Sequence, residues 1–201
     1  MEVKQQILNK SGKLFMRYGI KSITMDDIAR ELGISKKTLY QYVENKSDLI
    51  GQIFQQKISL EKQCMAEIHR EATDAVDEIL RIARYVIQEL RQLSPTTMYD
   101  LRKYYRNTWR QMEALQQKYV YKLIRENLER GQAEGLYRSN LDVDIVAKLY
   151  VAKTSMVVDE DLFPSRQYNI EKLFEEYIMY HIHGIASAKG LALLAMHPAI
   201  S

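Results

Sequence analysis

The chain has 201 residues, of which 46% are hydrophobic and 27% charged, a balance typical of a globular protein and not of a disordered or fibrous chain. Only 8 Gly and 3 Pro are present, too few for the many turns of a strand-rich fold. The single Cys excludes a disulfide framework and a multi-thiolate zinc site. No apolar run approaches the roughly 20 residues that span a bilayer, so we expect no membrane partner.

The net charge of +3 is unevenly distributed. Residues 1–50 hold nine of the 29 Lys and Arg and six of the 26 Asp and Glu, so the whole excess lies in the first quarter of the chain. Such asymmetry hints at an N-terminal end that binds a polyanion. The first residues lack the apolar segment of a secretory signal, and we therefore expect a reducing, cytoplasmic location.

Apolar residues recur at helical spacing from the start of the chain. They predict a first helix over residues 3–18, which Gly19 would end. A second, short helix is expected to begin after Thr24, with Asp27 in capping-box position, and to end at Gly33. These signals are local and each has a known stereochemical cause.

The remaining sequence also favours helices. Ser35 is expected to cap a third short helix and Asn45 a long fourth one of about six turns. A later helix is stopped by Pro95, and another is expected to end at Gly131. The further predicted helices occupy residues 73–92, 98–105 with a bend or break before 109, 112–131, 142–158 and 170–188. We therefore expect an all-α fold, with a small N-terminal unit and an all-α body.

The segment from Thr24 to Lys46 has the pattern of a helix-turn-helix. Gly33 tolerates the positive φ that a tight turn between two helices needs, and Ala29 supplies a small side chain at their crossing. Four apolar side chains are spaced to point inward: Ile28, Leu32, Ile34 and Leu39. Lys36, Lys37, Thr38, Gln41 and Tyr42 are then left around the outside of the second helix of the motif, the one that would enter the major groove.

This pattern resembles the tetracycline-repressor (TetR/AcrR) family of bacterial transcriptional regulators. The residues that carry the resemblance run from Thr24 through Gly33 and Tyr40 to Lys46 and Leu49. They cover about a quarter of the chain, and the body resembles the family only in its length and helix pattern. The resemblance implies a helix-turn-helix DNA-binding domain over residues 1–46 and an effector-binding and dimerisation domain over residues 47–201.

The resemblance also implies which side chains contact DNA. A helix N-terminus offers N–H groups to phosphate, Lys suits guanine, and Gln suits adenine, so the chemistry agrees with these roles. The alternative without a DNA contact is that Thr24 is only a helix cap and Lys46 only a solvated charge. The expected DNA-binding residues are Thr24, Ser35, Lys36, Lys37, Thr38, Tyr40, Gln41, Tyr42 and Lys46.

Two further sites in the body follow from the resemblance. Its last two large helices would form a homodimer, for which we expect Leu149, Met156, Phe174, Tyr177, Ile178 and His181. Aromatic residues with polar ends could line an effector pocket, for which we expect Tyr104, Tyr105, Trp109 and Met112. In each case the alternative is that the residues belong to the core of one protomer.

The function implied is a repressor that binds a palindromic double-stranded operator as a homodimer and is released by a small-molecule effector. The sequence holds no nucleophile elbow, phosphate loop or HExxH motif, so we expect no enzyme, no cofactor and no metal. Two alternatives stay open. The motif could serve protein interaction without reading DNA sequence, or the regulator could act without an effector.

Overall fold

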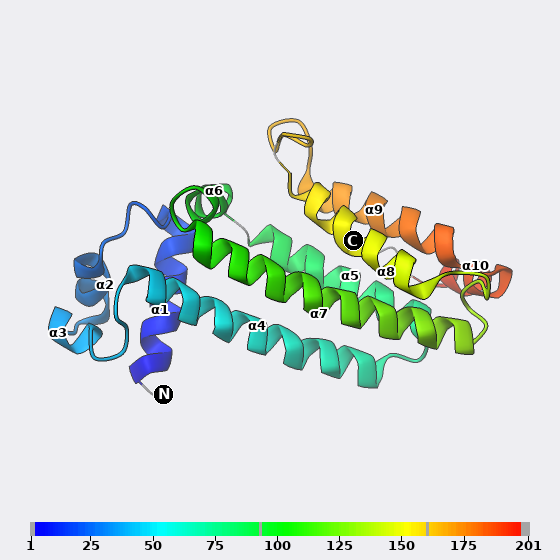
Figure 1. The fold of residues 1–201 in the computed structure, drawn as a ribbon, viewed down its shortest axis with the longest axis horizontal. Helices are drawn as coiled ribbons and strands as arrows, with labels where there is room; N and C mark the ends of the chain where they lie inside the picture. Colours follow the sequence, from blue (N-terminus) through cyan, green and yellow to red (C-terminus); the bar gives the residue numbers. More distant parts are fainter. Residues whose placement is uncertain (1–2, 93, 160, 198–201) are drawn as a thin grey trace. The chain divides into compact units, whose positions relative to one another are not determined.

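The computed structural model describes residues 3–92, 94–159 and 161–197. Within them the chain forms ten α-helices, which confirms the expected all-α fold (Figure 1). The helices are α1 (Val3–Tyr18), α2 (Met25–Leu32), α3 (Lys36–Leu39), α4 (Lys46–Glu71), α5 (Ala75–Arg91), α6 (Pro95–Tyr104), α7 (Arg106–Ala133), α8 (Val143–Val157), α9 (Ile170–Ile185) and α10 (Ala188–Leu194). None of the helices in these described ranges is both long and apolar enough to cross a membrane.

The helices group into two compact units. The N-terminal unit comprises residues 1–63 and 92–115, and the C-terminal unit comprises residues 64–91 and 116–201. Both α4 and α7 therefore contribute to each unit. Where the DNA-binding domain ends as a functional part stays a prediction.

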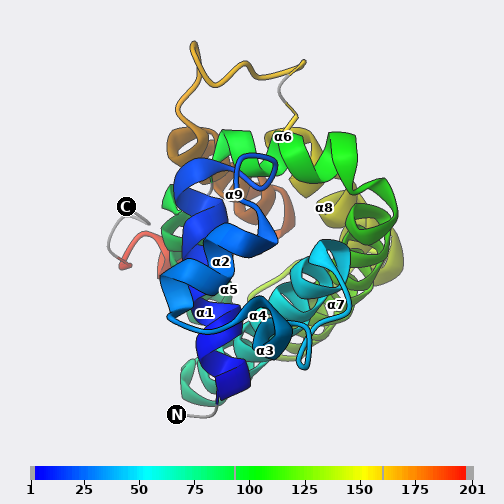
Figure 2. The same ribbon diagram turned by 90° about the vertical axis from the view of Figure 1, so that its left-hand side faces the viewer.

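In the N-terminal unit, α2 packs on α1 and α3 packs on α2 (Figure 2). Ile7, Ser11 and Phe15 recur every four residues on α1, which is why one stripe of this helix is buried. Ile28 of α2 and Leu39 of α3 are fully buried in the same apolar cluster. Packing on this common core holds the two short helices in place.

Helix α6 belongs to the same unit and docks on the C-terminal end of α1. The Thr97 hydroxyl donates to the Phe15 carbonyl at 2.6 Å. Gly19, which ends α1 as expected, has φ 81°, and a Cβ there would lie 2.9 Å from Thr96. The expected break before Trp109 is present at Tyr105, which separates α6 from α7.

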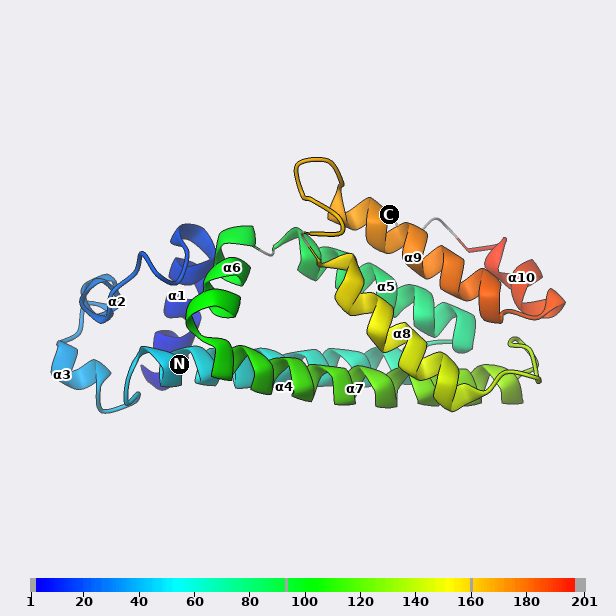
Figure 3. The ribbon, with the colours of Figure 1, turned by 45° about the horizontal axis from the view of Figure 1, so that its top comes forward.

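In the C-terminal unit, α9 packs on both α5 and α8 (Figure 3). The start of α5 is tied to the end of α7 by the carboxylate of Glu78, whose side chain is 1% exposed. This carboxylate accepts from Arg130 at 3.1 Å and from Asn127 at 3.2 Å. The Tyr137 hydroxyl lies 2.9 Å from the backbone carbonyl oxygen of Ala75 and 3.0 Å from the side-chain amide oxygen of Asn127. A buried charge needs partners of this kind, because an unpaired one is strongly destabilising.

Two expected helix ends were wrong. Helix α7 does not end at Gly131 but continues to Ala133, and Gly135, with φ 71°, provides the left-handed residue. The helix expected over residues 170–188 ends at Ile185, and Ser187 then caps α10. Gly131 has a packing role instead, since a Cβ there would lie 2.0 Å from the Tyr137 ring.

The close approach of α7 to Tyr137 gives a testable prediction. Gly131→Ala should lower the free energy of unfolding by about 1–3 kcal/mol, because the ring must shift and Tyr137 would lose its buried hydrogen bonds. Denaturant unfolding of the variant measures this loss. The control is Gly51→Ala in α4, where nothing lies within 4 Å of a new Cβ. That variant should be about 0.5–1 kcal/mol more stable, and equal stability of the two variants would contradict the packing role.

Candidate nucleic-acid interface

The N-terminus of α2 is closed by a complete capping box. The Thr24 hydroxyl oxygen accepts from the Asp27 N–H at 3.1 Å, and the Asp27 carboxylate accepts from the Thr24 N–H at 2.9 Å. The same carboxylate accepts the Thr24 hydroxyl hydrogen at 2.6 Å. The Thr24 hydrogen bonds, the largest cause, hold the pKa of Asp27 below its usual value. The expected cap is present, and Thr24 also stays exposed, at a helix end where N–H groups can bind phosphate.

A tight turn connects α2 to α3. Gly33 takes the left-handed conformation with φ 67° and ψ 29°, and its N–H donates to the Arg30 carbonyl at 3.1 Å. The next N–H, from Ile34, donates to the Ala29 carbonyl at 3.0 Å. Both bonds satisfy carbonyls at the end of α2, so the direction of the chain entering α3 is fixed.

Helix α3 is a single capped turn. The Ser35 side chain accepts from the Thr38 N–H at 3.0 Å, and the two hydroxyls lie 2.8 Å apart. After Leu39 the backbone tightens, since Gln41 and Tyr42 donate to carbonyls three residues earlier, at 3.2 and 3.1 Å. The short helix and this turn together present residues 36–42 as one convex segment.

This segment divides the predicted contact residues by exposure. Lys36, Lys37, Tyr40 and Gln41 are exposed, and Thr38 is half-buried behind Ser35. Tyr42 is also half-buried and packs on the apolar cluster of the N-terminal unit. An exposed stripe of two cations, an aromatic ring and an amide has the composition of a surface that reads base edges and phosphates.

One of the two exposed lysines already has a partner within the motif. The Lys36 ammonium lies 3.0 Å from the carboxylate of Asp26, at the start of α2. The hydrogen bond to Asp26 raises the pKa of Lys36. This ion pair links α2 to α3, and neither sequence pattern nor spacing indicated it.

Lys46 points into the unit. Its ammonium donates to the Ile20 and Ile23 carbonyls and lies 5.8 Å from the centre of the Phe15 ring. Burial, the largest cause, lowers the pKa of this ammonium. The sequence did hold a signal for this, because a lysine as the first residue of a helix opposes the helix dipole and needs another partner.

The residues expected to bind an effector lie in the N-terminal unit. Met112 is buried in the apolar cluster that holds the helix-turn-helix, and Tyr105 and Trp109 pack against it. Tyr104 is exposed, and its hydroxyl accepts from the Lys21 ammonium at 3.1 Å. The first three are thus brought together as core, and their role toward a ligand stays a prediction.

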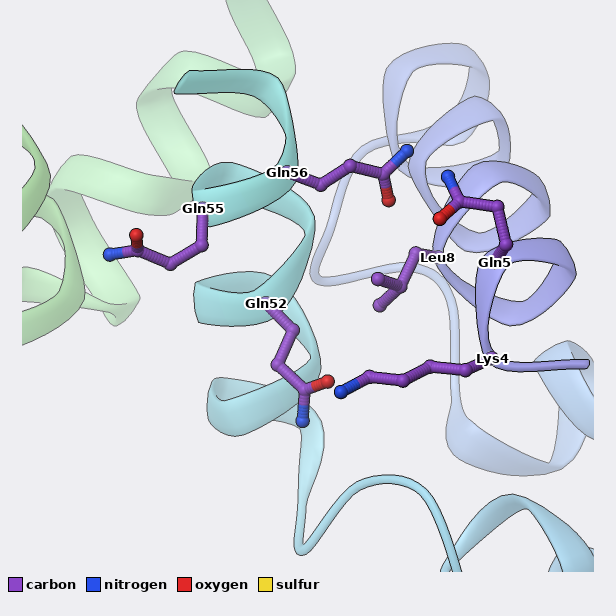
Figure 4. Close-up of a pocket in the computed structure, with 6 residues that line it drawn as sticks. All are labelled: Lys4, Gln5, Leu8, Gln52, Gln55 and Gln56. Atoms are coloured by element: carbon purple, nitrogen blue, oxygen red, sulfur yellow. The ribbon is translucent and has the colours of Figure 1, made fainter. Parts of the chain in front are cut away.

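A hollow of about 270 Å³ does lie in this unit, between α1 and α4 (Figure 4). Leu8 forms its apolar wall, and Lys4 and Gln52 point toward one another across it. Gln56 donates to Asn9 at 2.7 Å. None of the expected ligand-binding residues lines the hollow, whose lining is Lys4, Gln5, Leu8, Gln52, Gln55 and Gln56.

The residues expected at a dimer interface fall into two groups. Phe174, Tyr177 and Ile178 are buried within the C-terminal unit, whereas Leu149 and Met156 are 52% and 50% exposed on α8. The buried group packs α9 against α5 and α8 and is core of one protomer in this structure. The exposed group belongs to an apolar strip, which we call the α8–α9 strip, made of Ile145, Leu149, Met156 and Tyr180.

His181 lies between these groups. Its ring meets the Tyr150 ring edge-on at 4.9 Å, beside the bond from the Tyr177 hydroxyl to the Tyr150 carbonyl. Burial, with the nearby Lys153 charge, lowers the pKa of His181 to about 4. The imidazole is therefore neutral in the folded protein at neutral pH.

This shift predicts a dependence of stability on pH. Between about pH 6.5 and pH 4 the unfolded chain binds a proton at His181 that the folded chain does not, so the free energy of unfolding should fall as the pH falls through this window. His181→Asn should flatten that part of the stability curve, measured by denaturant unfolding. His183→Asn is the control, because His183 is exposed on the same helix. Identical slopes in wild type and His181→Asn would contradict the buried neutral state.

Residues 7–53 match the description "Bacterial regulatory proteins, tetR family". The chain is 24% identical over 184 residues to YvaF, an uncharacterised HTH-type transcriptional regulator of Bacillus subtilis strain 168, across 91% of this chain and 95% of the relative. It is 22% identical over 201 residues to the HTH-type transcriptional repressor KstR2 of Mycolicibacterium smegmatis, across 93% and 92%.

The fold is similar to that of solved regulators. The transcriptional regulator FadR from Bacillus subtilis, determined in complex with stearoyl-CoA, superposes with a TM-score of 0.70 at 19% identity. The superposition covers 90% of this chain and 98% of that chain. The likeness in fold thus extends beyond the helix-turn-helix to the helices that follow it.

Proposed function

We propose that this chain, whose residues 7–53 match the tetR family of bacterial transcriptional regulators, is a repressor of that family and not an enzyme. It would bind a palindromic operator as a homodimer and be released by a small-molecule effector. DNA binding through the helix-turn-helix comes with the family. Repression, the operator symmetry and the effector belong to the proposal.

One observation carries the DNA-reading part of the proposal. The turn at Gly33 and the caps at Thr24 and Ser35 hold residues 36–42 so that Lys37, Tyr40 and Gln41 are exposed while Leu39 is fully buried. A segment that packs on one side and offers a cation, a ring and an amide on the other can enter a major groove. We propose Lys36, Lys37, Thr38, Tyr40 and Gln41 as contacts, with Ser35 and Thr24 at the adjacent backbone.

Tyr42 and Lys46 complete the set of expected contacts but have other surroundings. Tyr42 packs on the apolar cluster, and the Lys46 ammonium binds backbone carbonyls. We therefore assign neither to the surface that meets the DNA.

A homodimer follows from the way a palindrome is read. Each protomer would offer residues 36–42 as its recognition segment. The two segments must be related by a two-fold axis and lie about one helical turn of DNA apart, ~34 Å. The α8–α9 strip supports this proposal, because Ile145, Leu149 and Met156 are exposed at helical spacing on α8. Tyr180 of α9 is 69% exposed, and its ring lies beside the Lys153 ammonium of α8. Of the expected interface residues, Leu149 and Met156 lie on this strip.

The effector would act by shifting a population between two states of the dimer. A small molecule that binds one state better moves the recognition segments out of register with the operator. The support is that FadR, which shares the fold, was solved with stearoyl-CoA. At 19% identity this similarity assigns no chemical class to the effector of the present chain.

Selection of bound sequences from random DNA tests the DNA-reading part of the proposal. The purified chain should enrich one palindromic sequence. Lys37→Met should weaken binding to it and reduce the steepness of the salt dependence by about 2, because two lysines per dimer no longer release counterions. Lys118→Met, an exposed lysine of α7, is the control and should leave both unchanged. A chain that enriches no sequence would refute the repressor function.

The dimer is tested by a charge on the α8–α9 strip. Leu149→Glu should weaken self-association by about 3 kcal/mol or more, because the new carboxylate would be buried unpaired against its partner. Light scattering over a range of protein concentrations measures this. Leu60→Glu is the matched control, since Leu60 is an exposed leucine of α4, 56% accessible, outside the strip. An unchanged dimer in the Leu149 variant would place the interface elsewhere.

A further inference from the structure

Lys46 stands at an electrostatically unfavourable position. It is the first residue of α4, directly after Asn45, whose side-chain oxygen accepts from the Asp48 N–H at 3.0 Å and so caps the helix. A cation in the first turn opposes the positive end of the helix dipole. The side chain is also half-buried, and burial lowers the pKa of its ammonium. Both costs need a compensating interaction.

The compensation comes from the turn between α1 and α2. The ammonium donates to the carbonyl oxygens of Ile20 and Ile23, at opposite ends of this turn. The Lys46 ammonium lies 5.8 Å from the centre of the Phe15 ring, near the end of α1. Nearby Asp100 and Asp27 favour the charged form of the ammonium.

The side chains of Ile20 and Ile23 are buried in the apolar cluster, but the backbone of the turn is held by only a few of the hydrogen bonds found in the described residues. Its own closing bond, from the Ile23 N–H to the Ile20 carbonyl, is long at 3.4 Å. The Lys21 N–H donates to the Asp100 carboxylate at 2.7 Å. Lys46 thus supplies the bonds to the carbonyl side of the turn, and Asp100 supplies the bond to its N–H side.

The turn leads directly into the helix-turn-helix formed by α2 and α3, the DNA-reading unit of the proposal above. Ile23 precedes Thr24, the cap of α2, and α2 in turn holds α3 through the Asp26–Lys36 ion pair. A shift of the turn would therefore move the end of α2 that faces phosphate, together with the attached recognition segment.

From this geometry we propose that Lys46 is a positioning residue, which fixes the α1–α2 turn and the N-terminus of α2 for operator binding and does not itself neutralise a DNA phosphate. The proposal rests on the operator-binding function above. It differs from the role that the sequence pattern indicated, in which Lys46 reaches the DNA backbone.

Salt dependence separates the two roles. Lys46→Met should lower operator affinity about tenfold, because two carbonyls lose their donor, while the slope of affinity against salt stays that of the wild type. Lys37→Met is the matched comparison and should lower the slope by about 2. A slope reduced equally in the Lys46 variant would show a phosphate contact and overturn the proposal. Unchanged affinity would overturn it as well.

A second measurement is made on the free protein and does not depend on DNA binding. Amide hydrogen exchange of residues 20–25 should be about tenfold faster in Lys46→Met than in wild type, with residues 35–42 least affected. Equal exchange rates of the turn in the variant and the wild type would overturn the proposal that Lys46 holds the turn. A wild type that enriches no DNA sequence would refute the function above, and this exchange experiment would still decide whether Lys46 holds the turn.

If Lys46→Met does not fold, nitrogen-15 spectra of the lysine ammonium groups in the wild-type chain replace the variant, with Lys46→Arg used for assignment. An ammonium held by two carbonyls should exchange its hydrogens slowly with water in the absence of DNA. Exchange as fast as that of exposed Lys37 would overturn the proposal.

Discussion

The DNA-reading unit depends on one constraint, that helices of four and eight residues cannot stabilise themselves in water. Their stability must come from their ends and from one buried face. In α2 and α3 both conditions are met, since Thr24 and Ser35 cap the N-termini, Gly33 closes the turn between them, and Ile28 and Leu39 are fully buried. Because packing and capping use these residues, the outer side chains of α3 stay exposed, and these are the ones proposed to meet DNA.

Two of the lysines in the N-terminal unit already have partners within that unit, so its net charge overstates the charge that can meet DNA phosphates. Residues 1–50 carry the whole net charge of the chain. Lys36 shares its charge with Asp26, and the ammonium of Lys46 is bound to carbonyls inside the unit. Lys37 is exposed near the start of the recognition segment, residues 36–42. In the recognition segment proposed above, the charge without an ion-pair partner is therefore that of Lys37, and the neutral groups Tyr40 and Gln41 are exposed beside it.

Sequence predicted best what short-range chemistry determines. The caps at Thr24 and Ser35 and the left-handed Gly33 depend on residues within four positions, and all are present as expected. Gly131 was wrong as a helix end because its role depends on Tyr137, whose ring direction no local pattern specifies. The direction of Lys46 depends on carbonyls 23 and 26 residues away, so spacing within the motif could not indicate it. On α9 the helical period marked an apolar face, but it could not tell core from interface.

The separation of roles along α3 has an evolutionary consequence. Leu39 is buried and the caps close the helix ends, whereas the side chains of Lys37 and Gln41 are exposed. Substitutions at exposed positions usually change stability little, so under the proposed function selection on these positions would act mainly through the target sequence. A duplicated copy of this gene could acquire a new operator in a few steps without first losing a stable protein.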